Sequence, residues 1–197
     1  MNLCDWREFV LVLVDVQHDF WTDDMAQSHP HFPRNVAQLL TFCRAERLDI
    51  VHLRASFQPN RSDWMVRYKL RDTIPCVAGT AGFDTLPFAH EQPGEPVFAK
   101  QTFDGFHNPA LLAHLHAHGK RFVLVAGLIT SVCVLLTAAS AAQRGFLTAI
   151  IEDCSADRSD MHDHVLDNYP FIFERTTLNA LPTQHQTWCD QLGQLPL

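Results

Sequence analysis

Three residues of this sequence carry side chains that could do chemistry together: Asp15, Lys100 and Cys133. A carboxylate can move protons, a buried ammonium can keep that carboxylate ionised, and a thiol can attack a carbonyl carbon. Each also has an ordinary structural explanation. A lone Asp often caps a helix or forms an ion pair, a lone Lys is usually solvated, and an unpaired Cys is usually a buried apolar residue. Their placement in the fold therefore decides between these interpretations.

Each of the three residues follows a short apolar run that predicts a strand. Asp15 ends the run 9–14, and Lys100 ends the run 97–99. Cys133 follows a third run and a short turn, in the first turn of an alanine-rich helix, where the helix dipole favours a thiolate. Ligands of parallel sheets bind beyond the carboxyl ends of the strands. The three side chains are therefore predicted to meet at that edge of a sheet.

Apolar runs alternate with segments of helical periodicity along the chain. The further runs cover residues 50–53, 122–126 and 147–151. Helical stripes follow Pro33 and Pro109, and proline suits the first turn of a helix. This alternation predicts an α/β fold with a parallel sheet covered on both sides. No repeat or linker divides the chain, so we expect one domain over residues 1–197.

The stretch from Ser56 to Pro96 interrupts this alternation. It is rich in Pro, Gly and polar residues, and it contains one short helical segment near Trp64 to Leu70. A loop of that length in a compact domain is usually functional. We therefore expect a long excursion that contributes to the active site or covers it.

Composition limits the partners of the protein. The 197 residues are 47% apolar and 19% charged, with a net charge of −7, which disfavours binding to nucleic acid or to an anionic membrane. Residues 122–143 carry no charge and are long enough to span a bilayer, but a strand, a turn at Gly127 and a helix explain them better. The six cysteines form no C-x-x-C pair and no disulfide framework. With no visible signal peptide, a cytoplasmic location is expected.

Several segments together make a recognisable pattern. In chain order they are LVLVDVQHDF, GTAGFDTLP, VFAKQTFDGF, FVLVAGLITSVCVLLTAASAAQRGF and IIEDCSADR. From about Phe9 to Thr177 the chain resembles the isochorismatase-like cysteine hydrolases, a family that includes nicotinamidases and N-carbamoylsarcosine amidohydrolase. The resemblance implies a three-layer sandwich with a central, mostly parallel six-stranded sheet and helices on both faces. It also implies a homo-oligomer, either a dimer or a tetramer.

The resemblance also implies roles for particular residues. It makes Asp15, Lys100 and Cys133 a catalytic triad, with a cis peptide bond between Leu128 and Ile129. The backbone N–H groups of Ile129 and Cys133 then form the oxyanion hole. We predict that the thiol cleaves the C–N bond of a small amide, ureido or carbamoyl compound through a thioester. Whether the thiol is ionised at rest or loses its proton to the carboxylate on substrate binding stays open.

The loop after the second strand differs from that of the nicotinamidases, which bind a metal through an Asp and His residues there. Ala55 and Phe57 stand at the Asp and first His positions, and neither side chain can ligate a cation. We therefore predict no metal and no cofactor, which disfavours nicotinamide as the substrate. His114 and His118 share a helix face without a further ligand nearby. The pair His162 and His164 is predicted to lie on a solvated helix start.

Two alternatives to the amidohydrolase remain. The true isochorismatases cleave a vinyl ether without the cysteine, so Cys133 argues against that activity. A non-catalytic binding protein on the same fold would not require an intact triad.

The substrate pocket is predicted to be largely apolar. The residues expected to contact substrate are Phe20, Leu128, Ile129 and Trp64. Phe103 and Phe106 either line the pocket or pack the core, and Cys154 is expected in a neighbouring wall. This lining suits a small, uncharged acyl group. An anionic substrate would require an arginine, and the candidates are Arg54, Arg61 and Arg67.

Overall fold

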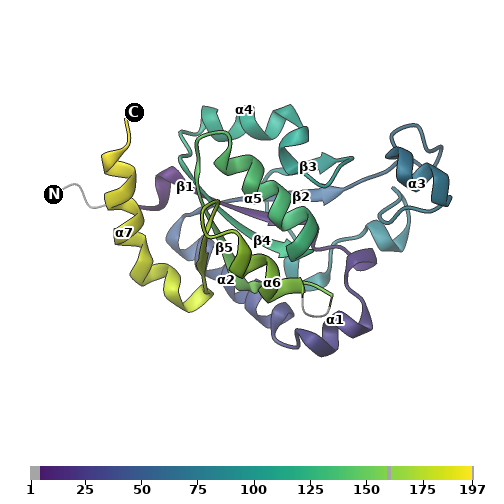
Figure 1. The fold of residues 1–197 in the computed structure, drawn as a ribbon, viewed down its shortest axis with the longest axis horizontal. Coiled ribbons are helices and arrows are strands. Elements are labelled where there is room, and N and C mark those ends of the chain that lie inside the picture. The colour runs from purple at the N-terminus through teal and green to yellow at the C-terminus, as the bar shows by residue number, and fades with distance from the viewer. Residues whose placement is uncertain (1–4, 159–160, 197) are drawn as a thin grey trace.

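The computed structural model describes residues 5–158 and 161–196 of the chain (Figure 1). In this part of the chain, one sheet has the strand order β3-β2-β1-β4-β5-β6, and all paired neighbours run parallel. The strands are β1 (Phe9–Val14), β2 (Asp49–Ala55), β3 (Val97–Lys100), β4 (Phe122–Leu128), β5 (Leu147–Ala156) and β6 (Glu174–Thr176). The predicted six-stranded sheet is confirmed, and it is parallel throughout.

Helices cover both faces of the sheet (Figure 1). They are α1 (Asp23–Ser28), α2 (Phe32–Glu46), α3 (Val66–Arg71), α4 (Pro109–Ala117), α5 (Leu135–Ala142), α6 (Met161–Asn168) and α7 (Leu181–Gln194). Because side chains alternate along a strand, each strand contributes to two cores. Leu11 and Leu13 of β1 pack with α2 and α7, whereas Val10 and Val12 pack with α4 and α5.

The order of the strands places a crevice above the centre of the sheet. β1 and β4 are adjacent, β2 and β3 extend the sheet on one side, and β5 and β6 extend it on the other. Ligands of such sheets bind where the strand order reverses, beyond the carboxyl ends of the strands. The segments that leave β1 and β4 are those that carry Asp15 and Cys133.

Gly127 of β4 allows the two central strands to approach closely. Its φ is +120°, and a Cβ there would lie 2.1 Å from the carbonyl oxygen of Val14. Any other residue would push β4 away from the end of β1. Glycine at this position therefore brings the segment after β4 close to Asp15, the residue that follows Val14.

The predicted excursion over residues 56–96 is present and carries α3, which projects beyond the sheet (Figure 1). It has a small core of its own, in which the buried residues are Ala55, Phe57, Trp64, Ile74 and Cys76. Leu86 and Ala89, further along the excursion, instead pack in the main core, and the Leu86 N–H donates to the carbonyl oxygen of Val16. The segment around α3 is therefore the part of the excursion that packs mainly on itself.

Two further expectations can be compared with the structure. None of the helices in the described residues is long and apolar enough to cross a membrane, and residues 122–142 form β4, a helical turn and α5. Cys43, Cys76, Cys133 and Cys154 are free thiols, whereas Cys189 is disulfide-bonded. One disulfide is not a framework, but it is a feature that oxidising compartments favour. The cytoplasmic location stays a prediction.

Candidate active site

The structure brings Asp15, Lys100 and Cys133 together at the carboxyl edge of the sheet. The Lys100 Nζ lies 2.7 Å from the Asp15 Oδ2 and 3.4 Å from the Cys133 Sγ. It also donates a hydrogen bond to the carbonyl oxygen of Thr102, at 2.9 Å. The three residues expose 0%, 1% and 6% of their surface. A charge pair that is so deeply buried is costly to form, which makes a purely structural role a poor explanation.

Asp15 is held in place by the neighbouring strand. Its backbone lies in the left-handed region, with a φ of +49°, and its Oδ1 accepts a hydrogen bond from the Ala55 N–H at 2.9 Å. The buried Gln17 accepts from the same N–H, and its amide donates to the carbonyl oxygens of Ala55 and Phe83. Gln17 was missed in the sequence, although it lies in the same motif as Asp15. It ties the end of β1 to the end of β2 and to the excursion.

Cys133 lies in a π-helical turn, Thr130–Val134, that leads directly into α5. The peptide bond before this turn, between Leu128 and Ile129, is cis. Burial raises the pKa of the Cys133 thiol well above its ordinary value, the Asp15 charge adds to this, and Lys100 opposes it. Burial also opposes the charge of Lys100, but Asp15 and Cys133 outweigh it and raise the pKa of Lys100. The geometry thus favours a neutral thiol beside an ion pair.

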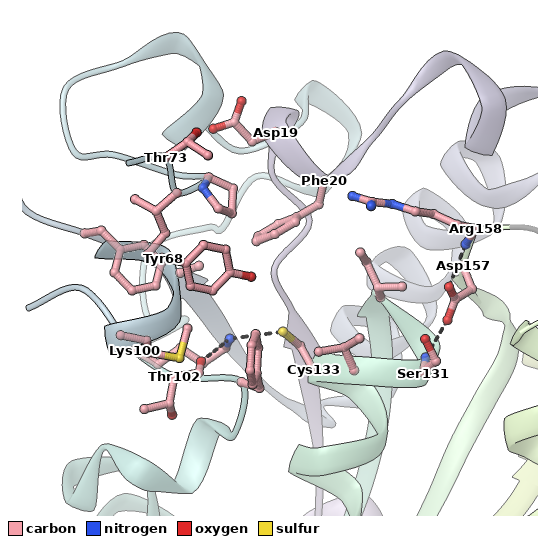
Figure 2. A pocket seen from close by; sticks show the side chains of 18 of the residues that line it. Asp19, Phe20, Tyr68, Thr73, Lys100, Thr102, Ser131, Cys133, Asp157 and Arg158 are labelled. Carbon is pink, nitrogen blue, oxygen red and sulfur yellow. Dashed lines mark hydrogen bonds between the residues drawn. The ribbon is translucent and has the colours of Figure 1, made fainter. Parts of the chain in front are cut away.

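A cavity of about 750 Å³ opens above these groups, with Lys100 and Cys133 in its lining (Figure 2). Phe20 and Ile129 line it, as predicted for substrate contacts, and so does Phe103. Two residues of the excursion, Met65 and Tyr68, form part of its wall. The volume is within the range of cavities that hold small-molecule ligands.

Other predicted wall residues lie elsewhere. Leu128 is fully buried in the core below the turn, and Phe106 and Cys154 are also core residues. Trp64 packs inside the small core of the excursion, where its indole N–H donates to the carbonyl oxygen of Gln58. Its large ring stabilises the excursion, which leaves the next residue, Met65, to face the cavity.

The arginines that line the cavity are different from those proposed from the sequence. Arg54 pairs with Glu91 and Arg61 pairs with Asp72. Among the described residues, the arginines that line the cavity are Arg71 and Arg158. Figure 2 shows the guanidinium of Arg158 extending towards Phe20. The lining is therefore less apolar than predicted.

The residues considered for metal binding in the sequence lie at two separate places in the structure. Ala55 and Phe57 line the cavity, where their methyl and phenyl groups cannot ligate a cation. His114 and His118 contact each other, with ring centroids 4.1 Å apart, beside a separate cavity.

The prediction that His162 is solvated was wrong, whereas His164 is exposed. His162 forms a hydrogen bond with the Thr130 Oγ1 at 2.8 Å, and burial lowers its pKa.

Comparison with known proteins agrees with this architecture. Residues 9–179 match the isochorismatase domain. The chain belongs to the isochorismatase family of hydrolases. This confirms the resemblance found in the sequence.

The relatives of this isochorismatase-family protein include an amidohydrolase. A maleamate amidohydrolase of Pseudomonas putida is 41% identical over 73 residues, which cover 36% of this chain and 34% of that protein. The match thus spans about a third of that relative's length.

Two solved structures share the fold. A cysteine hydrolase from Pseudomonas syringae superposes with a TM-score of 0.84 and 19% identity, over 93% of this chain and 95% of that one. An N-carbamoylsarcosine amidase from Thermoplasma acidophilum gives a TM-score of 0.75 and 22% identity, over 87% and 97%. At these identities the likeness concerns the fold alone.

Proposed function

We propose that this chain is a metal-independent cysteine amidohydrolase that cleaves the C–N bond of a small amide, ureido or carbamoyl compound. The observation that carries the proposal is the contact of Lys100 with both the Asp15 carboxylate and the Cys133 sulfur beneath a cavity. The partial match to a maleamate amidohydrolase supports an amide as the substrate.

The first half-reaction forms a thioester. The Cys133 sulfur attacks the carbonyl carbon while its proton passes to Asp15, and the backbone N–H groups of Ile129 and Cys133 stabilise the oxyanion. The tetrahedral intermediate then collapses and the C–N bond breaks. The departing nitrogen takes the proton from Asp15 and leaves as ammonia or an amine.

The second half-reaction hydrolyses the thioester. Asp15 accepts a proton from a water molecule as the oxygen attacks the acyl carbon. The C–S bond breaks, the acid product leaves, and the thiolate recovers its proton from Asp15. Lys100 forms an ion pair with Asp15 and holds positive charge beside the sulfur.

The raised pKa of the Cys133 thiol favours one of the two activation routes left open by the sequence. Burial and the Asp15 charge keep the thiol protonated at neutral pH, so the proton moves when the sulfur attacks. A neutral thiol also protects the free enzyme from alkylation, because the thiolate is the reactive form.

The arginines of the cavity favour substrates that carry a carboxylate. Arg71 and Arg158 line the cavity together with Asp19 and Asp157, and both of these carboxylates accept hydrogen bonds from backbone N–H groups. The guanidinium groups can bind a carboxylate of the substrate, which is then better accommodated than an uncharged acyl group alone. We propose small amides that carry a carboxylate as the favoured substrates. Figure 2 shows the guanidinium of Arg158 extending over the cavity towards Phe20, so Arg158 is the residue to test first.

Turnover of a panel of small carboxamides, ureas and carbamoyl compounds, with and without a carboxylate, tests the proposal. Cys133→Ala should abolish turnover, whereas Cys154→Ala removes a core thiol outside the cavity and should preserve it. A chelator should change nothing. Hydrolysis of a vinyl ether that survives in Cys133→Ala would instead identify an isochorismatase-type activity, and no turnover of any compound would favour a binding protein.

The homo-oligomer implied by the family resemblance is part of the same proposal. Val66 and Leu70 on the outer face of α3 are 74% and 81% exposed, which is unusual for apolar side chains on one helix face. Sedimentation analysis should give a mass of at least two chains, and a monomer at micromolar concentration would refute this part.

A further inference from the structure

Asp157 lies against the turn that carries the nucleophile, although it comes from the far end of β5. Its side chain is buried, and its Oδ2 accepts a hydrogen bond from the Ser131 N–H. Its Oδ1 accepts from the Arg158 N–H at 2.6 Å. Figure 2 shows these two bonds side by side at the edge of the cavity.

The turn needs such a partner because it begins a helix. The first N–H groups of a helix have no acceptor in the preceding turn. Within this turn, Val132 N–H and Val134 N–H both donate to the carbonyl oxygen of Ile129, at 3.0 and 3.2 Å. The Ser131 N–H is instead held from outside by the Asp157 carboxylate. A carboxylate in this position also interacts favourably with the positive end of the helix dipole.

The backbone of Asp157 is also held by a hydrogen bond. Its backbone N–H donates to the His29 Nε2 at 3.4 Å, and the His29 ring packs edge to face against His162. His162 in turn bonds the Thr130 Oγ1 at 2.8 Å. Two consecutive residues of the turn are therefore held by a connected set of polar groups outside the triad, in which Asp157 is buried and the two histidines are half-buried.

We infer that Asp157 is a positioning residue, which holds the nucleophile turn so that the Cys133 sulfur meets Lys100 and the Ile129 and Cys133 amides face the substrate oxygen. The inference rests on the proposed function for its kinetic consequences. Loss of the anchor lets the turn shift, and a shift of about 1 Å in a reacting group costs on the order of 10²-fold in rate.

Asp153 provides a matched control within β5, the strand that Asp157 follows. Its Oδ1 accepts a hydrogen bond from the Leu178 N–H at 2.9 Å, which is the same kind of carboxylate-to-backbone contact. This contact lies outside the lining of the cavity. Asp153→Ala thus removes an equivalent bond from β5 without touching the nucleophile turn.

The kinetic test compares Asp157→Ala, Asp157→Asn and Asp153→Ala on the best amide substrate. Asp157→Ala should lower kcat by about 10- to 100-fold with a KM within about threefold of the parent. Asp157→Asn should recover most of the rate, since its amide oxygen can still accept the Ser131 N–H. Asp153→Ala should keep the parental kcat. Unchanged kcat in Asp157→Ala, or an Asn variant as slow as the Ala variant, would overturn the inference.

A second readout does not depend on amide turnover. The rate of Cys133 alkylation by iodoacetamide is measured against pH, with the modified peptide identified by mass spectrometry because other thiols are free. In Asp157→Ala the released turn should expose the sulfur. The pH at which the alkylation rate is half-maximal should therefore fall towards that of an ordinary thiol. The profile should stay parental in Asp153→Ala, and a parental profile in Asp157→Ala would contradict the anchor. Failure of the proposed function would instead appear as amide turnover that survives Cys133→Ala.

Discussion

The floor and the wall of the cavity are built in different ways. The floor consists of three buried residues, Asp15, Lys100 and Cys133. Asp15 follows β1, Lys100 ends β3, and Cys133 lies in the helical turn after β4. The wall includes Met65 and Tyr68 of the excursion, whose other helix face is exposed to solvent at Val66 and Leu70.

This difference assigns the two regions different tasks. The floor must keep a buried charge pair and a thiol in fixed geometry, and only the sheet is rigid enough to do so. The wall contacts the parts of the substrate that do not react, and a loop with a small core can vary without disturbing the sheet. Changes in the floor should therefore affect stability and kcat together, whereas changes in the wall should affect mainly KM.

Lys100→Met should produce the largest effect. It leaves the Asp15 carboxylate buried without its cation, which should cost about 3–5 kcal/mol of unfolding free energy and abolish turnover. The double variant Asp15→Asn/Lys100→Met removes both charges and should recover much of that stability, still without turnover. Urea unfolding and amide hydrolysis measure the two properties. A single variant as stable as the parent would show that the pair is not buried as the structure has it.

Gly127→Ala should come next, because it disturbs the approach of β4 to β1. A Cβ 2.1 Å from the carbonyl oxygen of Val14, at a φ of +120°, should cost about 2–4 kcal/mol. Gly193→Ala is the control, since a Cβ at that position in α7 meets nothing within 4 Å. It should be neutral or add up to about 1 kcal/mol. Equal unfolding midpoints for the two variants would contradict the close contact.

Replacing Glu95 tests how the last residues of the excursion are joined to α2 and β2 through Arg44 and His52. Burial alone would raise the pKa of Glu95, but hydrogen bonds from Arg44, the Gln92 N–H and His52 lower it to about 2. Because the folded pKa is depressed, the stabilisation is fully present above the ordinary pKa of 4.5 and is lost as the pH falls towards 2. The difference in unfolding free energy between the parent and Glu95→Gln should therefore shrink between pH 5 and pH 2. A difference that is constant over this range would refute the assignment.

Tyr68→Ala should have the smallest effect and should separate the wall from the floor. Tyr68 lines the cavity from α3, and its loss should raise KM about 3- to 10-fold with kcat within about twofold. Lys69→Ala, an exposed position of the same helix outside the lining of the cavity, should leave both constants unchanged. A large fall of kcat in Tyr68→Ala would assign the wall a direct part in the chemistry.

Much of the floor could be predicted because it depends on short, local patterns. The apolar runs before Asp15 and Lys100 mark strand ends, and the strands of a parallel sheet end at one edge. The excursion and its short helix were visible as a change of composition. The short strand β6 (Glu174–Thr176) was missed because a three-residue edge strand has no apolar run.

The residues that line the wall, and those that hold the nucleophile turn in place, could not be predicted in the same way. Trp64 was assigned to the cavity, but packing within the excursion decides which face of that segment turns inwards. Asp157 contacts Ser131 across 26 residues of sequence, and His162 contacts Thr130 across 32. Such contacts arise from tertiary structure, and no spacing rule along the chain indicates them.

The most direct test of the central claim is to trap the acyl-enzyme on Cys133. The protein is mixed with its best amide substrate, quenched in acid at the earliest times, and analysed by intact mass and by peptide mapping. The account predicts a transient mass increase equal to the acyl group, located on the peptide that contains Cys133, absent from Cys133→Ala and present in Cys154→Ala. Amide turnover that continues in Cys133→Ala, or an acyl group located on another residue, would contradict it.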